Sequence, residues 1–328
     1  MRRSAVLLAV TLALAGCSDD DEAPAPTAPS RGTGTTATSA ADLGALAELP
    51  VPRTEVSGVA WRGRLAVGGG LTPDGGASDQ FHLWSPSGNR WVAGPRLPKP
   101  LHHSAMAVVG ERLFLVGGYT NGPGEAWVPQ ALVASLGDGE AAWRDEPAMP
   151  SPRGAHAAAV ARGVLVVTGG ESGGTPLATT TIYDPGARTW RPGPALDRPR
   201  EHLAAASAGG RVYAIAGRTG TEGNFTVVES LDPAADRAWR REPELVRSRG
   251  GIGADAVDGT VCVAGGEEAA GTIAPVECLR DGRWAAAADL ARPRHGLAVM
   301  ALDGRLHVVG GGDQPGLTVS GVHEAIEL

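Results

Sequence analysis

Arginine and histidine recur at one kind of position in this chain, in short polar links that lie at similar distances from one another. The residues concerned are Arg53, His102, Arg153, His156, Arg200, His202, Arg249, Arg294 and His295. A guanidinium group pairs with carboxylates and phosphates through two parallel hydrogen bonds, and a neutral imidazole can bind a metal ion. We therefore expect a polar ligand-binding site wherever the fold brings these links together.

Two interpretations of the arginines stay open from the sequence. Gathered around one axis, they would repel one another unless acidic groups or an anionic ligand lay between them, and this favours a ligand-binding mouth. Alternatively, each arginine bonds backbone carbonyls of a neighbouring repeat, or the acids Glu171, Glu201 and Glu267. We interpret the histidines as polar fillers rather than metal ligands, so we expect neither a metal ion nor a cofactor.

Motifs of common enzymes are missing from the sequence. It contains no Gly-x-Ser-x-Gly nucleophile turn, no zinc-ligand spacing and no phosphate-binding loop. Beyond residue 42 the chain has 26 basic and 31 acidic residues. Because nucleic-acid-binding proteins carry basic patches, this acidic excess argues against a nucleic acid as the partner.

The first residues are typical of a targeting segment. Arg2 and Arg3 precede an apolar run at residues 5–15, which is too short to span a bilayer. The run ends in Leu-Ala-Gly-Cys at Cys17, which resembles the lipobox of bacterial lipoproteins. That resemblance implies a signal peptide at residues 1–16 and a lipid on the Cys17 sulfur. The alternative is an ordinary secretory signal with a chance cysteine.

Two further segments follow the predicted signal peptide. Residues 17–42 are acidic at first and then rich in Pro, Ala, Thr, Ser and Gly. Such a composition cannot offset the entropy of ordering, so we expect a disordered tether carrying the lipid. Residues 43–328 have the length of one large all-β domain. The chain is thus expected to be exported and held at a bacterial membrane, on the periplasmic or cell-surface side.

The other two cysteines are Cys262 and Cys278. An even number of cysteines in an exported chain permits one disulfide. Both are predicted on neighbouring antiparallel strands of one repeat, where directly opposed residues come close enough for the bond. The alternative is two buried free thiols.

Internal repetition determines the predicted fold. A short apolar strand, a glycine-containing turn, a second apolar strand ending in Gly-Gly, a third strand and a tryptophan recur at intervals of 45 to 52 residues. The glycine pairs are Gly68-Gly69, Gly117-Gly118, Gly169-Gly170, Gly265-Gly266 and Gly310-Gly311, with Ala216-Gly217 in the remaining place. The tryptophans in phase are Trp91, Trp143, Trp190, Trp239 and Trp284. Each unit is predicted to be a four-stranded antiparallel meander.

This pattern of Gly-Gly, an aromatic residue near the third strand (Trp84, Tyr183) and a tryptophan resembles the Kelch repeat. The resemblance implies a six-bladed, galactose-oxidase-like β-propeller. The chain ends after the third strand of the sixth repeat, so we expect residues 43–49 to supply the missing fourth strand. Galactose oxidase itself uses copper with a tyrosine crosslinked to cysteine, and no such pair is indicated here.

In such a meander, the links between blades and the loops between second and third strands share one face, which we call the top face. Loops on a rigid scaffold usually carry the binding site. We expect a monomeric, non-catalytic binding module that holds a protein, a peptide or an anionic glycan there. The alternatives are a scaffold in an envelope assembly, and a sugar-acting enzyme similar to Kelch-type sialate mutarotases that uses Arg200 with Glu201, or Arg218 with Glu222.

Overall fold

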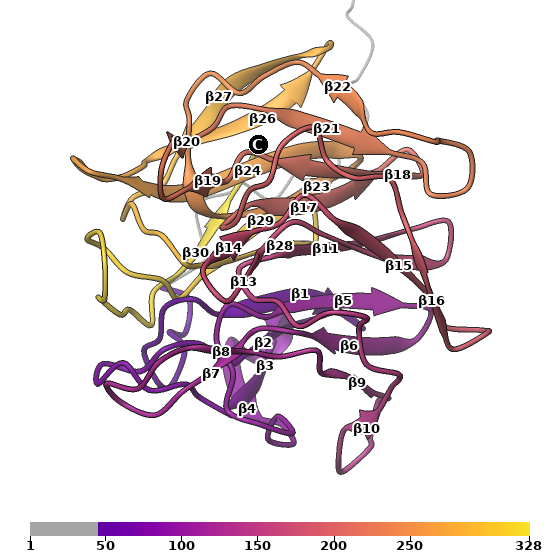
Figure 1. Cartoon of the computed structure of the whole chain (residues 1–328). Coiled ribbons are helices and arrows are strands. Elements are labelled where there is room, and N and C mark those ends of the chain that lie inside the picture. Colours follow the sequence, from indigo (N-terminus) through magenta and orange to yellow (C-terminus); the bar gives the residue numbers. More distant parts are fainter. Residues whose placement is uncertain (1–44) are drawn as a thin grey trace, which may run out of the picture. The chain divides into compact units, whose positions relative to one another are not determined.

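A computed structural model describes residues 45–328, which form six antiparallel sheets arranged as a β-propeller (Figure 1). We number the sheets as blades 1 to 6 in chain order. Each innermost strand contacts the innermost strands of both neighbouring blades, and blade 6 contacts blade 1, so the ring is closed. The predicted six-bladed, all-β fold is confirmed. Apart from the short 3-10 helix η1 (Pro86–Gly88), the described chain has no helix, and hence none that could span a membrane.

Each of the first five blades has four strands, and blade 6 has three. The innermost strands are β1 (Ser57–Trp61), β5 (Ala105–Val109), β11 (Ala157–Ala161), β17 (Ala204–Ala208), β23 (Gly250–Val257) and β28 (Ala298–Leu302). The second strands are β2 (Arg64–Gly68), β6 (Arg112–Val116), β12 (Val164–Thr168), β18 (Arg211–Ile215), β24 (Thr260–Glu268) and β29 (Arg305–Val309).

The third and fourth strands complete the blades toward the rim. The third strands are β3 (Phe81–Ser85), β9 (Val133–Leu136), β15 (Thr180–Asp184), β21 (Val228–Leu231), β26 (Pro275–Arg280) and β30 (His323–Ile326). The fourth strands are β4 (Arg90–Ala93), β10 (Arg144–Asp145), β16 (Thr189–Pro192), β22 (Arg240–Glu242) and β27 (Arg283–Asp289).

Small hairpins extend the blades above the top face. They are β7 (Tyr119–Thr120) with β8 (Val128–Pro129), β13 (Glu171–Ser172) with β14 (Thr175–Pro176), β19 (Arg218–Thr219) with β20 (Gly223–Asn224), and β25 (Gly271–Thr272) against the end of β24. These hairpins fall in the long loops between second and third strands. They place polar and aromatic side chains next to the links between blades.

The apolar side chains of adjacent blades fill the space between them. Six clusters of buried residues occur, and each combines side chains of two neighbouring blades. Innermost strands such as β11 and β17 are alanine-rich because the blades converge toward the axis. Second strands such as β6 carry Leu, Phe and Val that are buried on both faces. Burial between blades therefore supplies the main stabilisation of the ring.

Tryptophans on the outer strands tie each blade to the preceding one. The indole N–H of Trp143 donates to Pro95 O at 3.2 Å, and that of Trp190 to Pro147 O at 2.8 Å. Trp239 repeats this bond with Pro194 O at 2.9 Å. A buried indole that keeps a hydrogen bond adds packing area without the cost of an unpaired donor. The indole N–H of Trp284 has no partner, so what the five in-phase tryptophans all share is packing between blades.

The first described residues close the ring against blade 6. Leu49 N–H donates to Gly321 O at 2.8 Å, as Leu97 N–H does to Asp79 O in the next repeat. Trp91 also donates to Ala47 O at 2.8 Å, where other blades use a proline carbonyl. The fourth strand was predicted at residues 43–49; residues 45–49 lie beside blade 6 but are assigned to no strand, and residues 43 and 44 lie outside the described residues.

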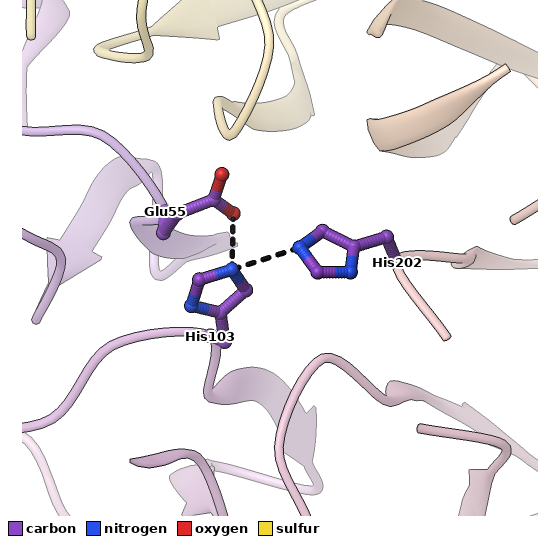
Figure 2. A group of neighbouring side chains, drawn as sticks. All are labelled: Glu55, His103 and His202. Carbon is purple, nitrogen blue, oxygen red and sulfur yellow. Dashed lines mark hydrogen bonds and ion pairs between the residues drawn. The ribbon is translucent and has the colours of Figure 1, made fainter. Parts of the chain in front are cut away.

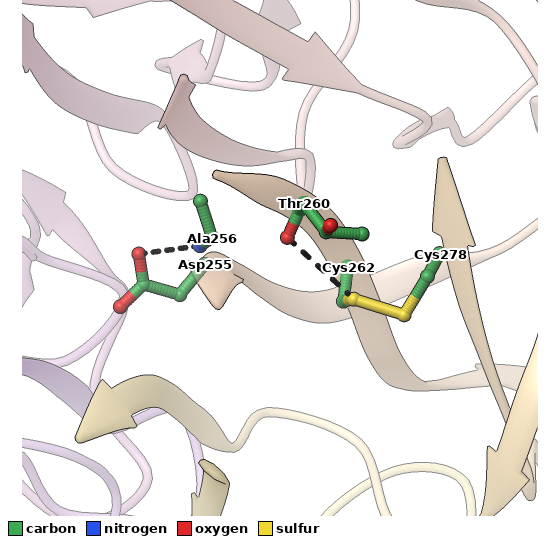
Figure 3. The surroundings of a disulfide bond; sticks show 5 residues. All are labelled: Asp255, Ala256, Thr260, Cys262 and Cys278. Atoms are coloured by element: carbon green, nitrogen blue, oxygen red, sulfur yellow. Dashed lines mark hydrogen bonds between the residues drawn. A yellow bond between two sulfur atoms is a disulfide. The ribbon is translucent and has the colours of Figure 1, made fainter. Parts of the chain in front are cut away.

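Cys262 and Cys278 are directly opposed on β24 and β26 and form a disulfide within blade 5 (Figure 3). Their Cα atoms are 4.1 Å apart. This short separation is typical of the antiparallel pairs that exchange no backbone hydrogen bonds. Both residues are fully buried in the cluster between blades 5 and 6. The bond thus staples two central strands of one blade.

Candidate functional site

Six equivalent residues, one from each link between blades, surround the axis at the top face. All six have positive φ, between 50° and 70°: Glu55, His103, Ala155, His202, Gly251 and Gly296. From His103 to Gly296, each backbone N–H donates to the carbonyl of the preceding member. The N–H of Val56, the residue after Glu55, donates to Gly296 O and closes the circle. The N···O distances run from 2.8 to 3.2 Å. We call this circle of links the axial ring.

Three side chains of the axial ring converge on one point (Figure 2). His103 Nε2 lies 3.1 Å from a carboxylate oxygen of Glu55 and 2.9 Å from His202 Nε2. They come from the links that begin blades 1, 2 and 4. Because the other three members are alanine or glycine, little side-chain volume fills the rest of the circle. We call Glu55, His103 and His202 the axial triad.

Further ionisable groups surround the axial triad. His295 Nδ1 lies 3.3 Å from the second oxygen of Glu55, and its Nε2 lies 3.7 Å from Glu267. Arg218 bridges Glu267 at 2.7 Å and Glu201 at 3.4 Å. Glu201 also contacts His202 Nδ1. The axis is thus an acidic network in which three carboxylates face one arginine.

Aromatic rings cover the blade 2 side of the axial triad. His102 Nδ1 is 2.5 Å from His103 Nδ1. The indole of Trp127 lies 4.6 Å from the His102 ring and 5.0 Å from the His103 ring, measured between centroids. Tyr119 lies beside the same indole, with the two ring centres 5.5 Å apart. Trp127 is nevertheless 48% exposed, so an aromatic surface open to solvent adjoins a buried polar cluster.

Protonation states within the triad follow from burial and from neighbouring charge. Burial lowers the pKa values of His103 and His202 well below the usual range, so both are neutral at pH 7. Burial would raise the pKa of Glu55, but His103, His295 and Arg218 outweigh it and lower that pKa to about 2. The triad thus combines two neutral imidazoles with a carboxylate anion.

His295 differs from the other histidines near the axis. Burial lowers its pKa, but the carboxylates of Glu55 and Glu267 outweigh this, and the net effect raises it. The same carboxylates that raise its pKa therefore favour the charged form of His295, which would neutralise part of the acidic network. His295 also donates toward the carbonyls of Gln314 and Gly316 at 3.0 Å, which holds the top loop of blade 6 against the axis.

A central channel continues from the axial ring toward the opposite face. Directly against the ring is a cavity of about 70 Å³, lined by the triad, His156 and the following apolar residues. A larger space of about 330 Å³ lies between the innermost strands. The carboxyl of Asp255 lines this space and accepts hydrogen bonds from the N–H groups of Ala256 and Ala301, both at 2.8 Å. Figure 3 shows the first of these bonds. The channel offers a small ion or water a place beneath the triad.

The five predicted arginines do not line the channel mouth. Their exposed fractions are only 0 to 2%: Arg53, Arg153, Arg200, Arg249 and Arg294. In four of them one guanidinium nitrogen donates both to a glycine carbonyl near the end of the second strand and to a carbonyl at or just before the start of the third strand. In Arg153, for example, these acceptors are Gly169 O and Thr179 O, both at 3.0 Å. Each arginine therefore fastens the top of its own blade.

Three of these arginines also form buried ion pairs within their blades. Arg200 pairs with Glu229 at 2.6 Å, Arg249 with Glu277 at 2.5 Å, and Arg294 with Glu324 at 2.8 Å. The acids are on the third strand, not the ones expected from the sequence. Because these guanidinium groups are buried and their terminal nitrogens bond groups of their own blades, a ligand on the top face has no access to them.

The four predicted histidines fall at three different positions of the repeat. His102 and His295 precede the axial ring by one residue, His202 belongs to it, and His156 follows it. Only His202 and His295 reach the converging network directly, while His102 buttresses His103. His156 is 5% exposed, and neither of its ring nitrogens has a partner. A shift of one residue along the link thus decides which histidine faces the axis.

Glu55 and His103 are the functional candidates that the sequence analysis did not select. Each lies two residues after the position that arginine occupies in the other links, as does His202. An alignment of the six links on that position would have shown two histidines and a glutamate in one column.

The arginine–glutamate pairs predicted for sugar chemistry do not form. Arg200 bonds Glu229 rather than Glu201, and Glu222 pairs with Arg198 at 3.4 Å and not with Arg218.

Comparisons with known proteins agree with this architecture. The Kelch motif matches residues 152–196. Kelch-like protein 34 of Homo sapiens is 29% identical over 238 residues, which cover 67% of this chain and 36% of that protein. The chain therefore spans about a third of the length of this relative. The solved structure titled "Structure of YjhT" superposes with a TM-score of 0.75 at 15% identity, covering 86% of this chain and 97% of that one.

Proposed function

We propose that this Kelch-repeat β-propeller is a non-catalytic binding module of the cell envelope that holds a glycan on its top face, beside the axial triad. The observation that carries the proposal is the exposed indole of Trp127 next to a cluster of polar groups. Binding sites commonly combine aromatic surface with a few convergent polar groups. The other seven tryptophans are buried or half-buried in the described chain.

The chemistry of a sugar suits both parts of this surface. The C–H face of a pyranose can stack on the indole of Trp127, since tryptophan offers a large rigid apolar area. Sugar hydroxyls both donate and accept, and they can bond the carboxylates of Glu201 and Glu267 and the guanidinium of Arg218. Arg218 keeps 27% of its side chain exposed. Glu201 and Glu267 are buried beside Arg218, so Arg218 is the group of this set that a ligand would reach first.

Charge at the axis favours a neutral glycan over the anionic one expected from the sequence. The three carboxylates of Glu55, Glu201 and Glu267 outnumber Arg218, the arginine of this network, whose side chain is partly exposed. The five repeated arginines lie inside the blades and cannot balance a negative ligand. An anionic sugar would meet repulsion at this face.

The glycan proposal is tested with a glycan array probed by the full chain, followed by titration of tryptophan fluorescence with each hit. Trp127→Ala should abolish binding and leave the melting temperature unchanged. Val92→Ala, at a residue 41% exposed on the outer strand β4, is the matched control and should bind normally. Undiminished binding by Trp127→Ala would contradict the proposal.

Catalysis is the competing possibility for a sugar ligand. The same glycans should therefore be followed by NMR for anomerisation in the presence of the protein. A rate equal to that without protein supports the binding module, and an accelerated rate would favour the enzyme.

Attachment to the envelope is part of the proposal and rests on the sequence alone. Cys17 lies outside the described residues, and its predicted lipid depends on the Leu-Ala-Gly-Cys sequence that it ends. In bacterial cells, the wild-type chain should partition into membranes and incorporate a labelled fatty acid. Cys17→Ser should lose the label, and membrane partition that the substitution leaves unchanged would contradict the lipid anchor.

A further inference from the structure

We propose that the axial triad of Glu55, His103 and His202 binds one divalent transition-metal ion on the propeller axis. This site does not depend on the glycan proposal, because the donors lie within the axial ring and the glycan surface lies beside it. The triad is the one group in the described chain in which three side chains offer ligand atoms within 4.8 Å of one another.

The geometry of the triad is close to that of a three-ligand metal centre. His103 Nε2 lies 2.9 Å from His202 Nε2 and 3.1 Å from the Glu55 carboxylate. Zinc binds imidazole nitrogen and carboxylate oxygen at about 2.0 to 2.2 Å, which puts neighbouring ligand atoms roughly 3.3 Å apart in a tetrahedron. His103 Nε2 would need to move a few tenths of an ångström away from its two neighbours, and the third pair of donors, on Glu55 and His202, lies within 4.8 Å and would close toward the ion.

The number of protons available at the triad also favours a cation. Neutral imidazole carries one N–H, and its other nitrogen is an acceptor. His103 Nε2 faces two acceptors at once, the carboxylate of Glu55 and Nε2 of His202, and one proton serves only one of these contacts. A bound cation would satisfy all three lone pairs together.

Neighbouring groups orient both histidines toward the common point. Glu201 contacts Nδ1 of His202, and His102 Nδ1 lies 2.5 Å from Nδ1 of His103. Histidine ligands of metals are usually held in this way, by a polar partner on the ring nitrogen that does not bind the metal. The triad therefore has support on the far side of each ring.

A second histidine pair in the molecule shows what an ordinary buried contact looks like. His307 and His323 both belong to blade 6, on the face that packs against blade 1. His307 Nδ1 lies 2.9 Å from His323 Nε2, and His323 also contacts Ala47 O. Their rings pack against Trp84. No carboxylate joins them in the described chain, so this pair fills space between blades and lacks a third ligand.

The donor set and the open side define the class of ion. Two imidazoles and one carboxylate suit zinc, cobalt, nickel, iron or copper better than magnesium or calcium. Ala155, Gly251 and Gly296 leave the rest of the axial ring without large side chains, and the cavity of about 70 Å³ adjoins it. Water can complete the coordination there. Three blades would then share one ion.

The test uses the full, untagged chain purified in detergent and stripped with a chelator. Co²⁺ is titrated while its visible absorption is recorded, and Zn²⁺ is added in competition. We expect one Co²⁺ per chain, displacement by Zn²⁺, and a melting temperature that rises with metal concentration. Glu55→Gln and His202→Gln should each weaken binding by at least about 100-fold, the upper end of the loss seen for outer partners of a metal site. His307→Gln is the control and should bind normally.

Two glycines of the axial ring keep the test decisive if the ligand variants fold poorly. A Cβ at Gly296 would lie 2.5 Å from a carboxylate oxygen of Glu55, whereas a Cβ at Gly251 would meet its nearest atom, in His295, at 3.4 Å. Both glycines have positive φ, so Gly296→Ala and Gly251→Ala strain the backbone alike. We expect only Gly296→Ala to lose Co²⁺ binding. Equal affinity in the two variants, or no stoichiometric binding by the wild-type chain, would overturn the proposal.

Discussion

The buried arginines and the axial triad lie two residues apart on the same links, yet they are organised in opposite ways. Arg200 bonds groups inside blade 4, whereas His202 turns toward groups contributed by other blades. The arginine recurs in five of the six links, while the axial ring carries glutamate, histidine, alanine or glycine. In this molecule, repetition accompanies a structural role and departure from repetition accompanies the candidate site.

The physical reason lies in how each position is shared. In each of the six blades, the second and third strands must be joined at the top face, so a residue that joins them is needed in every blade. Leu101 takes the arginine's place in blade 2 and is also fully buried. The axis occurs once, and side chains from all blades compete for its volume. Polar groups can therefore meet there only where other blades contribute alanine or glycine.

The largest effect that would sharpen this comparison is expected for a buried arginine. Arg249→Met should destabilise the protein by about 3–5 kcal/mol, because Glu277 would keep its charge in a buried site with backbone N–H donors but without its ion-pair partner. Chemical denaturation measures the loss. The double variant Arg249→Met with Glu277→Leu should recover most of it. Metal binding should be unchanged in whatever fraction stays folded, and a selective loss of binding would assign the arginine to the site.

Removing the disulfide provides a structural change that is remote from both regions. Cys262 and Cys278 enclose a loop of 16 residues, so replacing both with alanine should cost about 3 kcal/mol through the entropy of the unfolded chain. Denaturation with and without reductant measures this cost in the wild-type protein. The double alanine variant should lose no further stability when reductant is added. A large further loss would show that the reductant acts on something other than this disulfide.

Acid should destabilise the protein through His156, which lies in the link between Arg153 and the innermost strand β11. Burial lowers the pKa of His156 to about 3. Between pH 6.5 and 3 the unfolded histidine is protonated and the folded one is not, so stability falls as the pH falls, by roughly 1.4 kcal/mol per pH unit. His156→Leu should reduce that slope and leave stability at pH 7 nearly unchanged, since neither ring nitrogen has a partner. Denaturation between pH 7 and 4 compares the slopes, and identical slopes would contradict burial as the cause.

The smallest effect concerns the backbone of the axial ring. Ala155 has φ 50°, a conformation that costs a residue with a Cβ roughly 1–2 kcal/mol. Ala155→Gly should remove that strain, offset by about 0.5–1 kcal/mol of added chain entropy, for a net gain below about 1 kcal/mol. Ala157→Gly, in the adjacent strand β11, should only destabilise. A loss of stability in Ala155→Gly would show that its methyl group matters more than its φ.

Local patterns were sufficient to predict the fold. The period of the glycine pairs and tryptophans led to the correct number of blades and to the strand order within each blade. The pairing of Cys262 with Cys278 followed from their strands alone. Even so, the run Gly68-Gly69-Gly70 was divided incorrectly, because Gly69 and Gly70 are the two with positive φ. Three consecutive glycines contain no local information on which of them ends the strand.

The site could be located from the sequence only as far as the links of the top face. Arg53 was correctly placed in a link but assigned to the channel mouth, and its acceptors Gly69 O and Gln80 O come from distant turns of the blade. His202 was selected together with His102 and His156, although a change of one residue rotates the side chain to another environment. Glu55 was overlooked because a single glutamate in a polar link has no distinctive pattern.

The amino-acid sequence by itself determined the six-bladed ring and the face on which the links gather, because these depend on short-range features repeated along the chain. It placed Cys262 and Cys278 on neighbouring strands but left two free thiols as an alternative to the disulfide. Only the tertiary structure decided that the arginines point into their own blades and that Glu55, His103 and His202 meet at the axis. Residues 48 and 99 positions apart along the chain become neighbours there. Their meeting depends on closing the ring and on the positive φ of one residue in each link, and neither is encoded in any single repeat.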